Sequence, residues 1–126
     1  MTTLRFSRAN STLTATLADG AELTYPAANN VQHGCEPWPD GEFPYVGHVT
    51  HEGDGPASAY GSFGGLLFDV PGRTGMEIHS GRLMVPDGLM RSGIYHCTLG
   101  CIRTMDGAVR DLLGVLVAGD LLVVVG

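Results

Sequence analysis

The chain has few positively charged residues: its 126 residues include 7 Lys or Arg against 13 Asp or Glu, a formal net charge of −6 with neutral histidines. Nucleic-acid binding needs a basic face that neutralises phosphates, so this composition argues against a nucleic-acid partner. No apolar run approaches the roughly 20 residues of a membrane-spanning helix, which argues against membrane insertion. Charged residues make up only 16% and hydrophobic residues 44%, which argues against intrinsic disorder.

The N-terminus, Met1-Thr2-Thr3-Leu4-Arg5, lacks the apolar core of a signal peptide. Three interpretations follow: the chain stays in the cytoplasm, a leader has been removed, or export uses a route that reads no leader.

The 19 glycines and 7 prolines are interleaved with apolar runs, which favours one mainly β domain over residues 1–126 with many tight turns. Alternating apolar residues on either side of Asp19-Gly20 predict an N-terminal hairpin at about 11–25. Residues 26–44 read as a loop, and Pro71-Gly72 as a turn. Further strands are expected at 43–50, 66–70, 76–79 and 121–125, the last buried on both faces.

One helix is predicted at about 104–116, in the C-terminal half. Thr104 is the expected N-cap, and Asp106 is spaced to pair with Arg110. The apolar residues that recur at helical spacing are Met105, Val109, Leu112, Leu113 and Leu116.

Cys101 is the strongest candidate nucleophile. It lies directly before the predicted helix, whose unpaired N–H groups favour a thiolate, and Arg103 adds a positive charge. Gly100 leaves space beside the sulfur and lets backbone N–H groups converge on an oxyanion. The alternative is that Cys101 is a small buried side chain at a strand end.

His79 is the candidate general base. It ends the predicted strand at 76–79 and would activate a cysteine that the fold brings beside it. The alternative is a histidine at the edge of the core that donates to a backbone carbonyl.

Two stretches of the chain form a combined motif: Ile78-His79-Ser80-Gly81 and Thr98-Leu99-Gly100-Cys101-Ile102-Arg103-Thr104. Together they resemble the catalytic signature of the L,D-transpeptidase domain. Pro39-Asp40-Gly41-Glu42-Phe43 resembles the family's upstream strand entry, so the resemblance covers about residues 37–125. It implies a compact β-sandwich or barrel with one helix, no metal or organic cofactor, and peptidoglycan stem peptides as the substrate. It also implies a location in the periplasm or cell wall.

The resemblance gives each matching residue a role. Cys101 would be the nucleophile and His79 the base, and Arg103 would organise the site or the substrate carboxylate. The backbone N–H groups of Gly100 and Cys101 would contribute to the oxyanion hole. The acyl group of the third stem residue would pass through a thioester to an amine, giving a cross-link or D-amino-acid exchange, or to water, giving L,D-carboxypeptidase action. The substrate-side candidates are Ser80, Gly81, Thr98, Tyr95 and His48.

The chain departs from the family's pattern at two positions. Leu99 stands where the family often has a histidine, and Ser80 where it usually has a glycine. Leu99 resembles the variation in small transpeptidase-like toxins of type VI secretion, for which an immunity protein would be a partner. Besides the stem-peptide enzyme and the secreted toxin, a third interpretation is a non-catalytic wall-binding or structural module.

The other cysteines are weaker candidates. The triplet His33-Gly34-Cys35 is followed by Glu36, which would raise a thiol's pKa, and no helix is predicted after it. In an oxidising compartment, Cys35 and Cys97 would be the natural disulfide pair, leaving Cys101 free.

The remaining histidines and aromatic residues have simpler interpretations. A zinc set of His96, Cys97, Cys101 and His79 matches no closed ligand pattern, so no metal site is expected. His48 and His51 flank a strand end, where a solvated loop is the default. The aromatic residues Trp38 and Tyr45 are expected in the core or at its rim.

Overall fold

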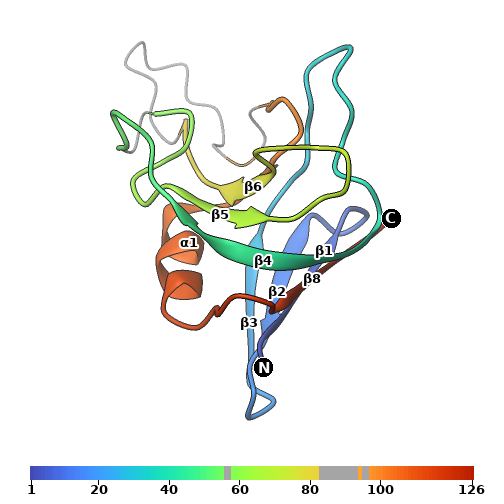
Figure 1. Cartoon of the computed structure of the whole chain (residues 1–126), viewed down its shortest axis with the longest axis vertical. Helices are drawn as coiled ribbons and strands as arrows, with labels where there is room; N and C mark the ends of the chain where they lie inside the picture. Colours follow the sequence, from blue (N-terminus) through green and yellow to red (C-terminus); the bar gives the residue numbers. More distant parts are fainter. Residues whose placement is uncertain (56–57, 83–93, 95–96) are drawn as a thin grey trace.

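The computed structural model describes residues 1–55, 58–82, 94 and 97–126 (Figure 1). Within them the chain forms β1 (Thr3–Ser7), β2 (Thr12–Thr16), β3 (Glu22–Pro26), β4 (Gly41–Val49), β5 (Gly65–Phe68), β6 (Glu77–His79), β7 (Ile102–Arg103), α1 (Asp106–Leu113) and β8 (Leu121–Val125). In this described part of the chain, no helix is both long and apolar enough to cross a membrane.

The strands form one mixed sheet in the order β3-β2-β1-β8-β4-β5-β6-β7. Strand β1 runs parallel to β8, and β6 parallel to β7, whereas the other neighbours are antiparallel. The long strand β4 joins the two halves of the sheet: residues 41–44 pair with β8, and residues from Tyr45 onward pair with β5, with a register shift between Tyr45 and Gly47. The mainly β architecture with one helix is therefore confirmed.

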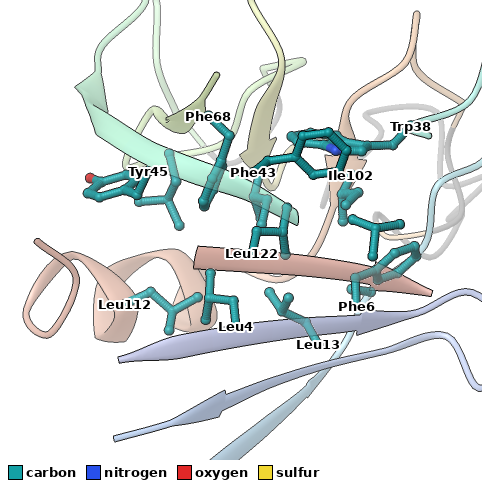
Figure 2. Packing of buried hydrophobic residues seen from close by; sticks show 14 of the residues in the cluster. Leu4, Phe6, Leu13, Trp38, Phe43, Tyr45, Phe68, Ile102, Leu112 and Leu122 are labelled. Carbon is teal, nitrogen blue, oxygen red and sulfur yellow. The ribbon is translucent and has the colours of Figure 1, made fainter. Parts of the chain in front are cut away.

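Alternating side chains from both halves of the sheet meet in one hydrophobic core (Figure 2). Leu13 and Leu122 enter it from one half, and Phe68 from the other, all at most 2% exposed. Trp38, from the segment before β4, packs edge-on against Phe43 and Phe68 with ring centroids 6.1 Å apart in each pair. Trp38 and Tyr45 are thus core residues, as expected.

Most predicted strands are confirmed. The hairpin consists of β2 and β3, and the apolar runs at 66–70 and 76–79 overlap β5 and β6. Strand β1 was not predicted, although Leu4 and Phe6 alternate with polar residues there. The prediction that the last strand is buried on both faces is wrong: in β8 only Leu122 and Val124 are buried, because its other side chains point away from the core.

The predicted helix is confirmed, but its expected end contacts are wrong. The helix begins at Asp106 with Met105 as N-cap and no capping side chain. Thr104 instead donates its hydroxyl to the Pro26 carbonyl at 2.8 Å, so this hydroxyl is held outside the helix. The Asp106 carboxylate accepts from Ser62, and Arg110 contacts Asp111 instead of Asp106.

Substituting Leu122→Ala should lower the free energy of unfolding by about 2–5 kcal/mol, because it removes a fully buried side chain at the centre of the sheet. The matched control is Val117→Ala, at a position 63% exposed, which should change it by less than about 0.5 kcal/mol. Urea unfolding followed by the fluorescence of the single tryptophan measures both. Equal midpoints for the two variants would contradict the packing described here.

Candidate active site

The pairing of β6 with β7 places the candidate catalytic residues on one face of the sheet. Ile78 pairs with Ile102, and His79 with Arg103. Both isoleucines are completely buried in the core. Because side chains alternate along a strand, His79 and Arg103 project from the opposite face, together with Cys101, which directly precedes Ile102.

A pocket of about 540 Å³ opens on this face. Cys101 and His79 both line it, so the structure brings the candidate nucleophile and base to one cavity. Arg103, Gly100 and Thr98 line it as well. Its size lies within the range of small-molecule binding sites.

The pocket is cationic although the protein is acidic. All seven basic residues of the chain are arginines, and Arg73, Arg82 and Arg103 line the pocket. None of the described residues that line it is an Asp or Glu. Such a lining favours ligands that carry carboxylates, since guanidinium groups pair well with them.

Cys101 is a protonated thiol in the resting site. Burial raises its pKa, and the negative charge of Glu77 adds to this increase. A hydrogen bond from the Glu77 amide to the sulfur, at 3.4 Å, and the charges of Arg103 and Arg73 act in the opposite direction but do not outweigh burial. The expected thiolate is therefore wrong for the resting site: the helix begins at Asp106, beyond β7, too far along the chain for Cys101 to precede it directly.

His79 is neutral near pH 7. Burial lowers its pKa to about 4, and the nearby charges of Arg103 and His51 act in the same direction, against a bond to Ser80 that raises it. Its Nδ1 lies 2.7 Å from the Ser80 carbonyl oxygen, which can only accept, so Nδ1 carries the proton. Nε2 is therefore unprotonated and can accept a proton from a thiol.

Arg103 serves as a buried cross-link. It is only 3% exposed, and its guanidinium donates to the carbonyls of Ser80 at 3.2 Å, Ala59 at 2.8 Å and Cys97 at 3.3 Å. Of the two roles implied for it, these contacts favour organising the site over binding a substrate carboxylate.

Gly100 shapes the turn that carries the nucleophile. Its φ of +149° suits glycine, and a Cβ there would lie 2.2 Å from Nη2 of Arg73. The Arg73 guanidinium is fixed over Gly100 by the carbonyls of Glu36 at 2.9 Å and Pro37 at 2.6 Å. The Gly100 amide donates to the Thr98 hydroxyl at 3.1 Å, so a place for it in an oxyanion hole would require this bond to break.

Thr98 and Asn29 hold the nucleophile turn in place. The Thr98 hydroxyl donates to the Cys101 carbonyl at 2.8 Å. The Asn29 amide donates to the carbonyls of Gly100 and Cys101, at 2.9 and 3.0 Å. Sequence reasoning missed Asn29 because its partners lie more than 70 residues away, and an Asn in a loop gives no sign of them.

Ser80, Gly81 and His48 do not line the pocket. Ser80 is 1% exposed and its hydroxyl donates to the Asp106 carboxylate, so its side chain is not accessible to a substrate. Its backbone carbonyl positions His79 by accepting from Nδ1. His48 Nε2 lies 2.6 Å from the Phe63 carbonyl. Tyr95, the last substrate-side candidate, lies outside the described residues.

The remaining cysteine and histidine expectations have mixed outcomes. In the described part of the chain, Cys35 and Cys97 are not joined to each other, so the structure does not contain the disulfide expected for an oxidising compartment. His51 does not lie in a solvated loop: it is half-buried, and its Nε2 lies 2.9 Å from Glu77 Oε1. Among the residues that the structure describes, no three His, Cys, Asp or Glu side chains are grouped to hold a metal ion. His96 lies outside them.

At neutral pH, iodoacetamide should modify Cys97 before Cys101, because Cys97 is exposed whereas burial raises the pKa of the Cys101 thiol. The Cys101 rate should rise steeply only above the usual thiol range. Peptide mapping by mass spectrometry reports both sites in one sample. Preferential labelling of Cys101 at pH 7 would contradict a resting thiol.

His79 should make the protein less stable in acid. The folded chain resists protonation of His79 until its pKa of about 4, whereas the unfolded chain takes up this proton near 6.5. Its contribution is complete above about pH 6.5 and is lost as the pH falls towards about 4, up to about 3 kcal/mol. The stability difference between the parent and His79→Gln, measured by urea unfolding across this range, should therefore shrink in acid; a difference independent of pH would rule this out.

Comparisons with known proteins support the fold. No protein-family model and no curated protein matches the sequence. Three solved structures cover 99% of the chain: an L,D-transpeptidase (Yku) from Stackebrandtia nassauensis (TM-score 0.66, 17% identity), Mycobacterium tuberculosis L,D-transpeptidase 1 (0.61, 18%) and an L,D-transpeptidase from Mycobacterium smegmatis (0.64, 18%). The chain spans 55%, 61% and 58% of those chains, respectively. The protein therefore has the fold of L,D-transpeptidase structures.

Proposed function

We propose that the protein is a cysteine-dependent acyltransferase of the L,D-transpeptidase type that acts on peptidoglycan stem peptides. The observation that carries the proposal is the pocket shared by the Cys101 thiol and the neutral imidazole of His79. The Ser80 carbonyl fixes Nδ1 of His79, which leaves Nε2 as the proton acceptor. The shared fold and the resemblance of the two motifs point to the same chemistry.

The reaction begins with neutral partners. Nε2 of His79 takes the thiol proton as the Cys101 sulfur attacks the carbonyl carbon of the third stem residue, and the carbonyl oxygen gains the electron pair. Collapse of this intermediate breaks the amide bond and expels the terminal D-alanine, whose amine takes the proton from His79. The acyl group then remains on the sulfur as a thioester.

The cations of the pocket suit both steps. Attack creates an oxyanion, and a fixed positive charge close to it lowers the barrier. Arg73 lies over Gly100 at the nucleophile turn, and its charge opposes part of the increase in the pKa of Cys101 that burial causes. Arg82 lines the same pocket and is available to a substrate carboxylate, whereas Arg103 donates to backbone carbonyls.

The second half-reaction depends on the acceptor. An amine gives a cross-link or D-amino-acid exchange, and water gives L,D-carboxypeptidase action. Leu99 is 70% exposed and lines the pocket, in place of the family's frequent histidine, so the acceptor meets an apolar side chain there. The same site would serve a secreted antibacterial toxin in the periplasm or cell wall, and an immunity protein would then be its partner.

Cys101→Ala should abolish the conversion of tetrapeptide stems in purified sacculi, because it removes the thiol that His79 is proposed to deprotonate. His79→Ala should lower the rate by about 10²–10⁴-fold through loss of the base. Liquid chromatography with mass spectrometry separates dimeric muropeptides, exchanged stems and tripeptides, and so identifies the acceptor. The matched control is Cys35→Ala, outside the pocket, which should keep the parent rate; turnover by Cys101→Ala at that rate would refute the proposal.

A further inference from the structure

Glu77 is a buried carboxylate that the proposed reaction does not use. It is 5% exposed and lies on β6, two residues before His79. Its backbone amide donates to the Cys101 sulfur at 3.4 Å. A buried carboxylate is costly to maintain unless it is paired, so its side-chain partner is informative.

That partner is His51. Its Nε2 lies 2.9 Å from Glu77 Oε1, and both side chains are largely enclosed. The His51 amide donates to the Asp54 carboxylate at 2.9 Å, and the Asp54 amide to the His51 carbonyl at 3.2 Å, which closes a turn around the histidine. His51 is thus fixed at its backbone and at its ring.

The His51 ring leads back to the candidate base. Tyr60 stacks on it with ring centroids 3.6 Å apart and an interplanar angle of 12°. The same tyrosine meets His79 edge-on, with centroids 5.0 Å apart and an angle of 62°. A continuous set of contacts therefore runs from Glu77 through His51 and Tyr60 to His79.

Gly65 makes room for this arrangement. It pairs with His79 across β5 and β6, and a Cβ there would lie 1.7 Å from Glu77 Oε1 and 2.7 Å from its carboxyl carbon. Any side chain at this position would displace the carboxylate. The Glu77 carboxylate therefore occupies the space that a side chain at Gly65 would need.

We propose that Glu77 is a positioning residue of the Cys101–His79 site, which anchors His51 and thereby holds Tyr60 against the imidazole of His79. The inference rests on the proposed function, because the orientation of His79 matters only where it acts as base. Misplacement of a catalytic group by about 1 Å can cost about 100-fold in rate, so an anchor of this kind has a measurable effect.

The charge of Glu77 provides a second readout. Among the residues that the structure describes, the charged and titratable groups around the Cys101 sulfur include Glu77 and His79 from β6, Arg103 from β7 and Arg73 from the turn before β6. The same pocket is also lined by Tyr60, Arg82 and Cys97. The Glu77 carboxylate raises the pKa of Cys101, so its removal should shift alkylation of the thiol to lower pH. Loss of turnover together with easier alkylation would distinguish positioning from general unfolding, which would also expose Cys35 to the reagent.

Three variants test the anchor. Glu77→Ala should lower stem-peptide turnover about tenfold while the Cys101 alkylation profile, mapped by mass spectrometry, shifts to lower pH. Glu77→Gln should show the same shift but recover most of the turnover, because its amide oxygen still accepts from His51. His51→Phe keeps an aromatic ring at the stack and removes the bond to Glu77, so turnover should fall. Glu42→Gln, on the exposed face of β4, is the matched control and should change neither.

A double-mutant cycle tests the contact itself. Gly65→Ala should lower turnover in the parent but have a much smaller further effect in the Glu77→Ala background, because the two closest contacts of its added methyl group are with the carboxylate and only the 3.1 Å contact with Cβ remains. The matched control is Gly47→Ala on β4, whose Cβ would meet nothing within 4 Å. Additive losses in the cycle would overturn the proposed contact.

The outcomes separate this inference from the proposed function. Parent-like turnover by both Glu77→Ala and His51→Phe would overturn the positioning role and leave the acyltransferase intact. If the parent itself converts no stem peptide, the proposed function fails, and the positioning role that rests on it fails as well. If the parent is active, Glu77→Ala alkylation profiles that coincide with those of the parent would contradict the placement of the Glu77 charge beside the Cys101 sulfur.

Discussion

The parallel register of β6 and β7 is the constraint on which the site depends. These strands have only three and two residues, yet Ile78 and Ile102 are completely buried side by side. Because side chains alternate, this hydrophobic pair forces the polar residues on either side of it to the opposite face. A slip of one residue would exchange the two faces and bury Cys101 and Arg103 in the core.

Polar contacts reinforce this register from both sides. The Thr104 amide donates to the His79 carbonyl at 2.8 Å, and Arg103 exchanges backbone bonds with Ala28 beyond the edge of β7. The Arg103 side chain then reaches back over β6 to the Ser80 carbonyl, the same oxygen that fixes His79. The carbonyl of a single residue thus aligns the base and the cross-linking cation.

Local patterns in the sequence predicted the helix and most strands, but they did not predict the contacts between these elements. The hairpin of β2 and β3, the strands β5 and β6 and the existence of α1 follow from alternation, turn residues and helical spacing, which are properties of neighbouring residues. The start of α1 was misplaced because the Thr104 hydroxyl, a good cap in isolation, is used by Pro26, 78 residues away. No local pattern could reveal such a competitor.

The site shows the same division. The motifs around His79 and Cys101 identified both residues, and the strand pairing then placed them in one pocket. The contacts of Asn29 and Glu77 depend on segments distant in sequence, so the sequence alone could not assign them. One feature of the sequence does point to Glu77: a charged residue in a short buried strand needs a side-chain partner.

Burial gives this site its chemical character. It raises the pKa of the Cys101 thiol and lowers that of the His79 imidazole, so both groups are neutral at rest. The thiolate is the form that reacts with oxidants and metals, so a protonated sulfur is protected while the pocket is empty. Charge separates only as the sulfur attacks a carbonyl, and the pocket's arginines can stabilise the oxyanion at that moment. A Glu77 carboxylate beside the nucleophile fits this scheme, because it also favours the protonated thiol at rest while its bond to His51 holds the rings that pack against the base.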